Sequence, residues 1–371
     1  MAACANAPAW RNFFGDTCST YASNHWCSDG LLVNTSTGGA VFGSPESACC
    51  ACGRTRELKV LRKRHSNVKQ AVFFATHTMD ETDTALVRHY VDDLEQHFRA
   101  AKLFILYYQS AQSLPASSSH VGSWLRTAAR SRSAMCVWNE AGLFSLFPRL
   151  EGALSNSSAL AETPKPFRRY FFFHASLLLW NATYGHAFPG IEYWWRIEPD
   201  VLFAGSLSQM IEHASHVRVD LLLPNIESQS EIPDWPHWER NRDTIDGVPT
   251  NKRFMSLVCL GRYSSAFLLQ TMGQRWATGV LGYEEISLST SCAVDSSCQM
   301  ESLWRRSKVK TAKHCLYRPV WECSRFLAAR AAENQELWHP VKNRSCVVEW
   351  LTSRRRNNSV ASTENTRKLP Q

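Results

Sequence analysis

The stretch EYWWRIEPDVLF, residues 192–203, sets two carboxylates at the end of a strongly apolar run. Its aromatic and aliphatic side chains predict a strand packed on both faces, because such strands have few polar positions. Pro199 cannot donate to a sheet ladder, so it favours the end of that strand over its middle. Glu198 and Asp200 are therefore either satisfied by local backbone donors or turned toward a ligand.

The sequence before this stretch predicts a βαβ unit. QAVFFATHT (70–78) is typical of a buried strand, and KLFILYYQ (102–109) of a second one. Between them, residues 83–101 space their apolar side chains at helical intervals. Strand, helix and strand of these lengths imply a parallel sheet with both faces covered, hence an α/β fold.

Weaker patterns extend this α/β organisation. We expect a third strand at 134–140, a largely buried helix over 166–185, a helix at 207–217 and a strand at 220–225. The Ser-rich stretch 111–133 is typical of a loop. At 371 residues, the chain is long enough for one sizeable α/β domain and a small additional module.

The additional module lies at the N-terminus, where cysteines are concentrated. Six of the 13 cysteines fall within residues 1–53: Cys4, Cys18, Cys27, Cys49, Cys50 and Cys52. An even number in a short segment with little core predicts three disulfides, although a metal knuckle is an alternative. The adjacent pair Cys49–Cys50 does not match usual zinc-ligand spacing. The other seven cysteines are an odd number, so at least one should stay unpaired or bridge to another chain.

The end of this module, ACCACG, resembles the small six-cysteine modules of secreted microalgal proteins that end in A-C-C-x-C-G. That resemblance covers about fifty residues and implies an extracellular setting. N-x-S/T sequons at Asn34, Asn156, Asn181, Asn343 and Asn357 agree with it.

The N-terminal sequence gives less information about the location of the chain than its cysteine content does. Residues 1–10 show no charged start followed by an apolar core, so we expect a leader or anchor to be missing from this chain. The longest apolar run, 171–180, contains His174 and is too short to span a bilayer. The expected location is the secretory-pathway lumen, such as the Golgi or endoplasmic reticulum, or the extracellular space.

The net charge of +8 is carried by two segments outside the expected domain. Residues 54–69 contain seven Lys/Arg and one acid, and residues 351–371 contain five Lys/Arg and one acid. We interpret them as a basic linker and a disordered basic tail around a domain at 70–350. Because nucleic-acid binders spread their basic residues over a folded face, nucleic acid is excluded as an expected partner.

Two acids one residue apart at a strand end suggest a divalent cation site. In open α/β sheets, ligands bind beyond the carboxyl ends of the strands. A hard cation accepts oxygen ligands and neutralises the charge on a leaving phosphate. The structural alternative is that Glu198 and Asp200 cap the next helix or bond to Arg196.

The heptapeptide WRIEPDV, preceded by RRYFFFHASLLLW, resembles the metal-site region of the fungal α-mannosyltransferases of glycosyltransferase family 15. The wider likeness, over about 70–350, is diffuse. The resemblance implies a GT-A-like, Rossmann-like α/β/α domain. It also implies that Glu198 and Asp200 bind Mn²⁺ (or Mg²⁺) and the diphosphate of a nucleotide sugar.

Other parts of that family's pattern point to further residues. WHPVK (338–342) is similar to the family's Y-H-P, which implies His339 as a metal ligand, with a structural histidine as the alternative. Lys342 could meet a phosphate oxygen or simply be solvated. Glu284 and Glu285 resemble a Y-E element and could supply a general base or steady an oxocarbenium-like centre. Glu285 is preferred if the segment is extended, because alternation would then place it beside Tyr283; a surface pair is the alternative.

Donor and acceptor contacts are expected from loops. His77 follows the first strand, where GT-A enzymes contact the nucleotide base and ribose, and Asp80 or Asp83 could serve the same purpose. The Pro-broken stretch 231–243 offers an aromatic platform for a sugar ring. Its candidate side chains are Trp235, His237 and Trp238. The alternative is a loop closed by its own tryptophans.

The sequence also departs from the family. The segment C-H-F-W-S-N-F-E-I, which holds a candidate nucleophilic glutamate, is not found, and the roughly corresponding stretch 253–268 contains no acid. Donor sugar and stereochemistry therefore stay open, with mannose as one candidate. Two hypotheses result: a metal-dependent hexosyltransferase acting on a glycan or glycoprotein, or a secreted carbohydrate-binding protein on a degenerate transferase scaffold. A zinc hydrolase is disfavoured because no H-E-x-x-H or comparable ligand set occurs.

Overall fold

We analysed a computed structural model of the chain. It describes residues 6–7, 16–28, 31–32, 48–52, 67–77, 80–108, 135–156, 171–185, 188–203, 205–241, 245–303, 314–315, 320–331 and 337–352. The expected loop at 111–133, nearly all of the linker at 54–69 and the tail beyond Thr352 lie outside the described residues, as does Cys4.

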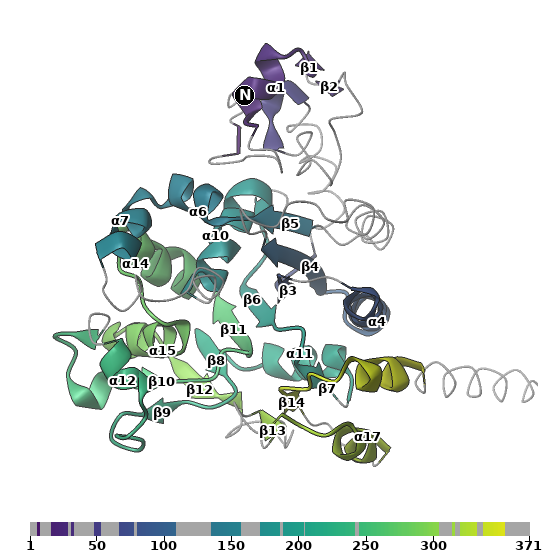
Figure 1. Ribbon diagram of the computed structural model, residues 1–371, viewed down its shortest axis with the longest axis vertical. Coiled ribbons are helices and arrows are strands. Elements are labelled where there is room, and N and C mark those ends of the chain that lie inside the picture. Colours follow the sequence, from purple (N-terminus) through teal and green to yellow (C-terminus); the bar gives the residue numbers. More distant parts are fainter. Residues whose placement is uncertain are drawn as a thin grey trace, which may run out of the picture.

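A seven-stranded sheet forms the centre of the molecule (Figure 1). Its order is β12 (Met300–Ser302), β8 (Leu221–Leu223), β11 (Leu260–Ser264), β6 (Tyr193–Ile197), β3 (Gln70–Thr76), β4 (Ala101–Tyr108) and β5 (Met135–Trp138). β3 runs parallel to both β4 and β6, as the βαβ pattern predicts. The expected purely parallel sheet is nevertheless mixed, because β11 lies antiparallel between β6 and β8.

Helices cover both faces of this sheet, which confirms the α/β/α class. α4 (Glu81–His97) and α11 (Leu207–Ser215) pack on one face. The other face is covered by α6 (Glu140–Leu146), α7 (Pro148–Asn156), α10 (Phe173–Tyr184), α14 (Gly273–Ala277) and α15 (Glu284–Val294). β3 shows why two cores form, since Phe73 enters one apolar cluster while Val72 and Phe74 enter the other.

The expected elements are present with shifted ends. α4 begins at Glu81 because the side chain of Asp80 accepts a hydrogen bond from the backbone N–H of Asp83 at 2.8 Å. The strands expected at 134–140 and 220–225 are shorter than the sequence pattern, as β5 and β8. α10 occupies the described part of the helix expected over 166–185, and 10 of its 12 residues are buried.

A smaller three-stranded sheet extends from the end of β6. It consists of β13 (His314–Cys315), β14 (Leu337–His339) and β7 (Leu202–Phe203). β14 pairs antiparallel with β7, with Trp338 opposite Leu202 and Leu337 opposite Phe203. This pairing brings the C-terminal part of the chain to the segment that follows Asp200.

The remaining short elements complete the domain. They are β9 (Glu227–Ser228), β10 (Phe254–Met255), α12 (His237–Arg240), the 3-10 helix η6 (Thr250–Lys252), the π-helix η7 (Phe267–Met272), α17 (Cys323–Ala331) and a helical stretch over 344–352. A disulfide between Cys323 and Cys346 joins α17 to that last helical stretch.

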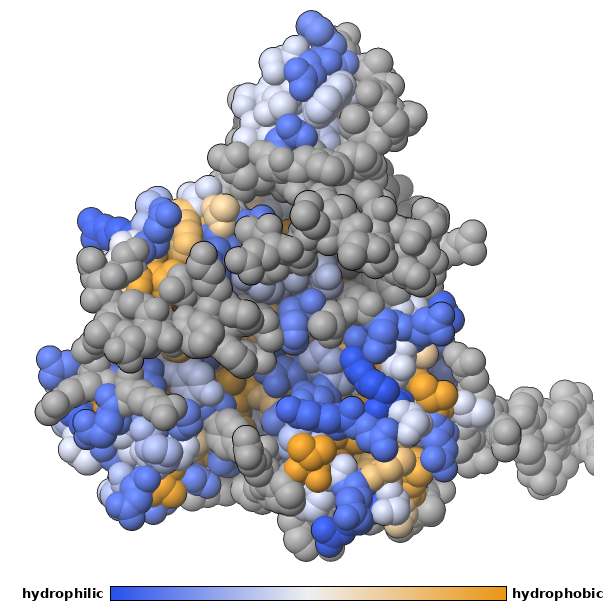
Figure 2. All heavy atoms as spheres, in the orientation of Figure 1, coloured by the Kyte–Doolittle hydropathy of each residue, from blue (hydrophilic) through white to orange (hydrophobic). Residues whose placement is uncertain are grey.

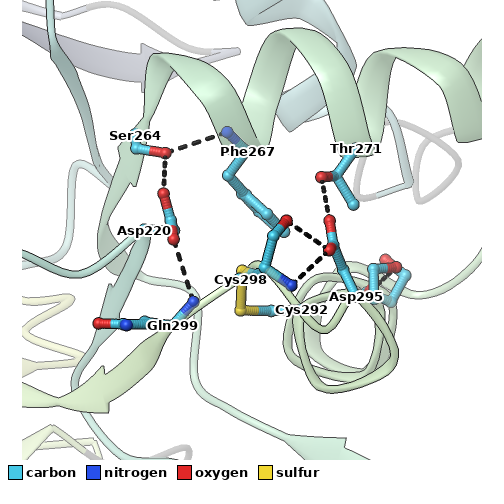
Figure 3. Close-up of a disulfide and its surroundings, with 11 residues drawn as sticks. Asp220, Ser264, Phe267, Thr271, Cys292, Asp295, Cys298 and Gln299 are labelled. Atoms are coloured by element: carbon cyan, nitrogen blue, oxygen red, sulfur yellow. Dashed lines mark hydrogen bonds between the residues drawn. A yellow bond between two sulfur atoms is a disulfide. The ribbon is translucent and has the colours of Figure 1, made fainter.

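A disulfide between Cys292 and Cys298 closes the end of α15 (Figure 3). Around it, Asp295 accepts a hydrogen bond from the hydroxyl of Thr271 at 2.8 Å. Asp220 accepts from the hydroxyl of Ser264 at 2.6 Å and from the backbone N–H of Gln299 at 3.0 Å. These bonds connect the C-terminal end of α15 to the π-helix and to the sheet. They therefore fix the position of α15, including its N-terminal end.

The N-terminal module has its own small core. It contains α1 (Cys18–Ser23), β1 (Cys27–Ser28), β2 (Leu31–Leu32) and a 3-10 helix, η3 (Cys50–Cys52). Disulfides join Cys18 to Cys49 and Cys27 to Cys52, and Cys50 is also disulfide-bonded. Cys18, Cys27, Cys49 and Cys52 pack with Ala7, Tyr21 and Ala48 in a cluster separate from the two large ones. The disulfide interpretation of the described cysteines in this module is thus confirmed.

The surface of the described residues is mostly hydrophilic. On the face seen in Figure 2, hydrophobic patches are small and separated by hydrophilic side chains. Among the described residues, the large hydrophobic side chains left exposed are Leu269, Val280, Val294, Val320 and Val348. No helix within the described ranges has the length and apolar character needed to cross a bilayer.

Candidate metal and sugar-nucleotide site

The acid pair stands at the carboxyl end of β6. The last residue of β6, Ile197, pairs with Leu260, and the backbone N–H of Glu198 donates to the carbonyl of Cys259 at 2.9 Å. A turn follows immediately, in which the N–H of Val201 donates to the carbonyl of Glu198 at 3.1 Å. Both carboxylates therefore leave the chain where the strand ends, with Pro199 between them, as the sequence predicts.

His339 reaches this edge from the far C-terminal part of the domain. Its strand β14 pairs with β7, and the N–H of Val341 donates to the carbonyl of Asp200 at 2.9 Å. The imidazole Nε2 of His339 lies 3.7 Å from Glu198 Oε2 and 3.6 Å from Asp200 Oδ1. One ligand atom from each of the three residues lies within 4.8 Å of the others, so the set could hold one metal ion.

The electrostatics of these three residues favour positive charge between the two carboxylates. Burial and the negative charge of Glu198 raise the pKa of Asp200. Burial lowers the pKa of His339, but its contact with Cys259 and the two carboxylates outweigh this and raise the pKa to about 10. The imidazolium of His339 thus supplies positive charge that the acid pair requires. A divalent cation could take its place, because imidazole ligates metals in its neutral form.

Arg196 supports Glu198 from beneath. Its guanidinium donates to Glu198 Oε1 at 2.8 Å and to the carbonyl of Val258 at 2.7 Å, and it lies over the ring of Phe173. Burial raises the pKa of Glu198, but the charges of Arg196 and His339 outweigh it and hold the pKa below its usual range. The structural alternative, a bond between the acid pair and Arg196, therefore holds for one oxygen of Glu198. The other oxygen faces His339.

Glu284 belongs to a buried hydrogen-bonded chain. Its carboxylate accepts from the backbone N–H of His174 and lies against the ring Nδ1 of the same residue, both at 2.7 Å. The other ring nitrogen of His174 lies 2.6 Å from the hydroxyl of Tyr263. Burial lowers the pKa of His174 and raises that of Tyr263, so the phenol donates to a neutral imidazole. Both oxygens of Glu284 thus have a partner in α10.

Glu285 is buried as well, in the first turn of α15. The expectation of an extended segment is wrong, because a helix begins at Glu284. The alternative of a surface pair is wrong as well, because both glutamates are buried. The carboxyl group of Glu285 hydrogen-bonds the phenol of Tyr283, and its Oε2 has no partner among the described residues. Burial and the charges of Glu198 and Glu284 raise the pKa of Glu285 well above its usual range. The folded environment of Glu285 thus favours the protonated, neutral form of its carboxyl group.

The aromatic loop lies against the start of α15. Trp238 is only 3% exposed and donates its Nε1–H to the carbonyl of Ile232 at 2.9 Å, so it belongs to the loop's own core. His237 stacks on the ring of Tyr283, with centroids 5.3 Å apart and planes 18° apart. Trp235 is half-buried and packs edge-on against Trp238. Trp238 therefore closes the loop, as the alternative predicts, while Trp235 and His237 stay partly accessible.

The remaining predicted residues lie around the same edge of the sheet. His77 directly follows β3 and is half-buried. Asp80 caps α4 and also lies 3.4 Å from the guanidinium of Arg344, so its carboxylate already has partners. Lys342 is exposed, and its charge lowers the pKa of Asp200, which places the ammonium group near the acid pair.

Three functional neighbours were not expected as such: Arg196 as a support, His174 and Cys259. The sequence could have predicted the role of Arg196, because a charged residue inside so apolar a strand needs a buried partner. His174 likewise stands inside the apolar run 171–180. Nothing in the sequence predicted a role for Cys259, because its position depends on the antiparallel strand β11, which the sequence pattern did not indicate.

Comparisons with known proteins show distant likeness in fold. No protein-family model and no curated protein matches the sequence. The mannosyltransferase Ktr4p from S. cerevisiae in complex with GDP is 10% identical over 66% of this chain and 77% of that one, with a TM-score of 0.34. Core-mannan synthase A from Aspergillus fumigatus, in its Mn/GDP form, is 13% identical over 60% of this chain and 68% of that one, with a TM-score of 0.33.

Glucosyl-3-phosphoglycerate synthase from Mycobacterium tuberculosis, in complex with Mg²⁺ and UDP, is also similar. It is 11% identical over 66% of this chain and 85% of that one, with a TM-score of 0.29. These likenesses are too distant to assign a family or an activity, so the function is argued from the geometry of the site.

Proposed function

We propose that this chain is a divalent-metal-dependent glycosyltransferase of GT-A type that moves a hexose from a nucleotide diphosphate to a glycan or glycoprotein. One observation carries the proposal: Glu198, Asp200 and His339, which come from two distant parts of the sequence, meet at the carboxyl edge of the sheet. Open α/β sheets bind ligands at this edge. The resemblance of WRIEPDV to family 15 supports the choice of a sugar nucleotide as the ligand.

The three side chains fit Mn²⁺ or Mg²⁺. Two carboxylate oxygens and one imidazole nitrogen suit a hard or borderline ion, and no thiol belongs to the set. When bound, the ion would neutralise charge on the diphosphate leaving group. Lys342 would add positive charge from solvent at the same place, and His77 lies at the same sheet edge, where the nucleoside would bind.

Glu285 is the candidate acid–base group. Its second oxygen has no partner among the described residues, and its carboxyl group is held by Tyr283 beside the partly accessible side chains of Trp235 and His237. A sugar acceptor that packs on these rings would bring a hydroxyl group toward Glu285. Glu284 would then act as a positioning residue, because both of its oxygens are occupied by His174.

The disulfides suit an oxidising compartment. Cys18–Cys49, Cys27–Cys52, Cys292–Cys298 and Cys323–Cys346 occur in two separate parts of the molecule. We place the chain in the secretory lumen or outside the cell, with a nucleotide-sugar donor and a glycan or glycoprotein acceptor as its partners.

The test is a screen of nucleoside diphosphates and their sugars with and without Mn²⁺. We expect a rise in melting temperature that needs both metal and one nucleotide base, and metal-dependent release of that nucleoside diphosphate from its sugar. If glycans stabilise the chain while no nucleotide does at any metal concentration, the chain is a carbohydrate-binding protein and the proposal fails.

A further inference from the structure

The ring of His339 must be held in place by something other than the acid pair. Its Nε2 lies 3.6–3.7 Å from the two carboxylates, which is longer than a good hydrogen bond. The pairing of β14 with β7 fixes the backbone of this residue but leaves its side-chain torsions free. Metal-binding imidazoles are usually oriented by a hydrogen bond at their other ring nitrogen.

Cys259 makes a hydrogen bond to this ring. The thiol of Cys259 is hydrogen-bonded to the side chain of His339, and the residue is 3% exposed. It precedes β11 and packs in the same apolar cluster as Leu260 and Trp338. Cys259 forms no disulfide, and Cys136 is a second buried, reduced cysteine within the described ranges.

The same residue also holds the other half of the site. The carbonyl oxygen of Cys259 accepts the backbone N–H of Glu198 at 2.9 Å. One residue on the antiparallel strand segment therefore contacts the backbone of the first acid and the ring of the histidine. These two groups are far apart in the sequence, because Glu198 lies in the middle of the domain and His339 near its C-terminal end.

We propose that Cys259 is a positioning residue that orients the imidazole of His339 toward Glu198 and Asp200 and so raises the affinity of the site for its metal ion. This deepens the proposed function and rests on it for the metal. The thiol suits the position because it is small and can stay in an apolar cluster while its sulfur accepts a weak hydrogen bond from the ring N–H.

The first experiment needs no metal. In protein labelled with ¹⁵N-histidine, the ring signals of His339 are identified by their loss in His339→Gln. We expect Cys259→Ala to shift these ring signals and Cys259→Ser to shift them less, because the serine hydroxyl keeps an acceptor for the ring N–H. Cys136→Ala is the matched control, since Cys136 is also buried and reduced but lies in β5. Unchanged His339 signals in Cys259→Ala would overturn the proposal.

The second experiment measures Mn²⁺ affinity by electron paramagnetic resonance in the same variants. We expect Cys259→Ala to bind about tenfold more weakly, the size usual for loss of a ligand-orienting group, and Cys259→Ser to recover most of that loss. Cys136→Ala should bind like the wild type. Equal affinity in wild type and Cys259→Ala contradicts the inference, whereas a wild type that binds no Mn²⁺ contradicts the proposed function. In that last case, the ring signals still decide whether Cys259 orients His339.

Discussion

At the scale of single residues, the site is a balance of charges around Glu198. Arg196 neutralises one of its oxygens from below, and the other oxygen faces His339 beside Asp200. Because Asp200 is half-buried next to a second carboxylate, its charge is destabilising on balance, although His339 and Lys342 oppose this effect. Function and stability therefore oppose each other at this residue.

This opposition gives a prediction for Asp200→Asn. The substitution keeps the shape and removes the charge, so the melting temperature without metal should stay the same or rise. The Mn²⁺-dependent rise should disappear, and nucleotide-sugar turnover should fall on the order of a hundredfold, because a charged ligand of the metal is lost. Thermal melts and turnover across a Mn²⁺ titration measure both. Asp92→Asn, on the exposed face of α4, is the control and should change neither quantity. A strongly lowered melting temperature, or wild-type turnover, would show that Asp200 is structural.

Glu285→Gln separates an acid–base role from a packing role. Folding raises the pKa of Glu285, so the folded chain binds this proton more tightly than the unfolded chain. The cost of burying the group therefore grows as pH rises above its unfolded pKa, and glutamine removes that cost. We expect an unchanged or higher melting temperature at pH 7 and turnover lower by roughly a hundredfold or more. Glu239→Gln, exposed in α12 of the same loop, is the control. Turnover retained in Glu285→Gln would rule out the catalytic role.

At the scale of elements, two contacts decide how the sheet edge is built. The pairing of β14 with β7 delivers His339, and the start of α4 is tied to the C-terminal segment through Arg344. Arg344 lies 2.8 Å from Asp83 and 3.4 Å from Asp80. Burial raises the pKa of Asp83 to about 6, although the charge of Arg344 opposes this. The ion pair thus connects the two chain segments that border the site.

Arg344→Met should destabilise the chain in a pH-dependent way. Because folding raises the pKa of Asp83, the folded state gains stability from protonation below about pH 6 and loses it as pH rises from about 4 to 6. Without Arg344, the ionised carboxylate of Asp83 at neutral pH lacks its cationic partner. We expect a loss of about 2 kcal/mol at pH 7.5, discounted because Arg344 is itself partly exposed, and a smaller loss at pH 5.

Denaturant unfolding at both pH values measures this difference. Arg218→Met is the control, because Arg218 is 76% exposed and lies 3.9 Å from its partner Glu192. Arg218→Met should change the free energy of unfolding little at either pH. An Arg344→Met variant whose loss is the same at pH 5 and pH 7.5 would contradict the assignment of the effect to Asp83.

At the scale of the whole molecule, the N-terminal module and the α/β domain have separate cores. The buried cysteines of the module cluster with Ala7, Tyr21 and Ala48, while the strands of the central sheet all begin at or after Gln70. We propose that residues 1–53 and 70–350 are independent domains joined by a basic linker.

Removal of residues 1–60 tests this organisation. The truncated chain should keep the melting temperature of the α/β domain within about 2 °C, because none of the residues of its two large cores is lost. Its Mn²⁺-dependent stabilisation should also persist. Calorimetry of the full and truncated chains makes the comparison. A truncated chain that is insoluble, or that melts far below the full chain, would show that the module is part of the domain.

The sequence by itself determined the local features of this protein. Periodicity and large apolar side chains predicted β3, α4, β4 and β6, and Pro199 marked the place where β6 ends. The two acids on either side of Pro199 predicted a cation site, and the concentration of cysteines predicted disulfides. The predictions of these elements and of the disulfides hold because each depends on the preferences of residues that are neighbours in the chain.

Only the tertiary structure decided which distant residues meet. The antiparallel strand β11 places Cys259 beside Glu198, and the pairing of β14 with β7 brings His339 to Asp200. The burial of Glu284 and Glu285, which the sequence left as a possible surface pair, depends on α15 packing against α10. Such contacts are long-range: their free energy comes from pairing and burial that exist only in the folded chain, and no local pattern encodes them.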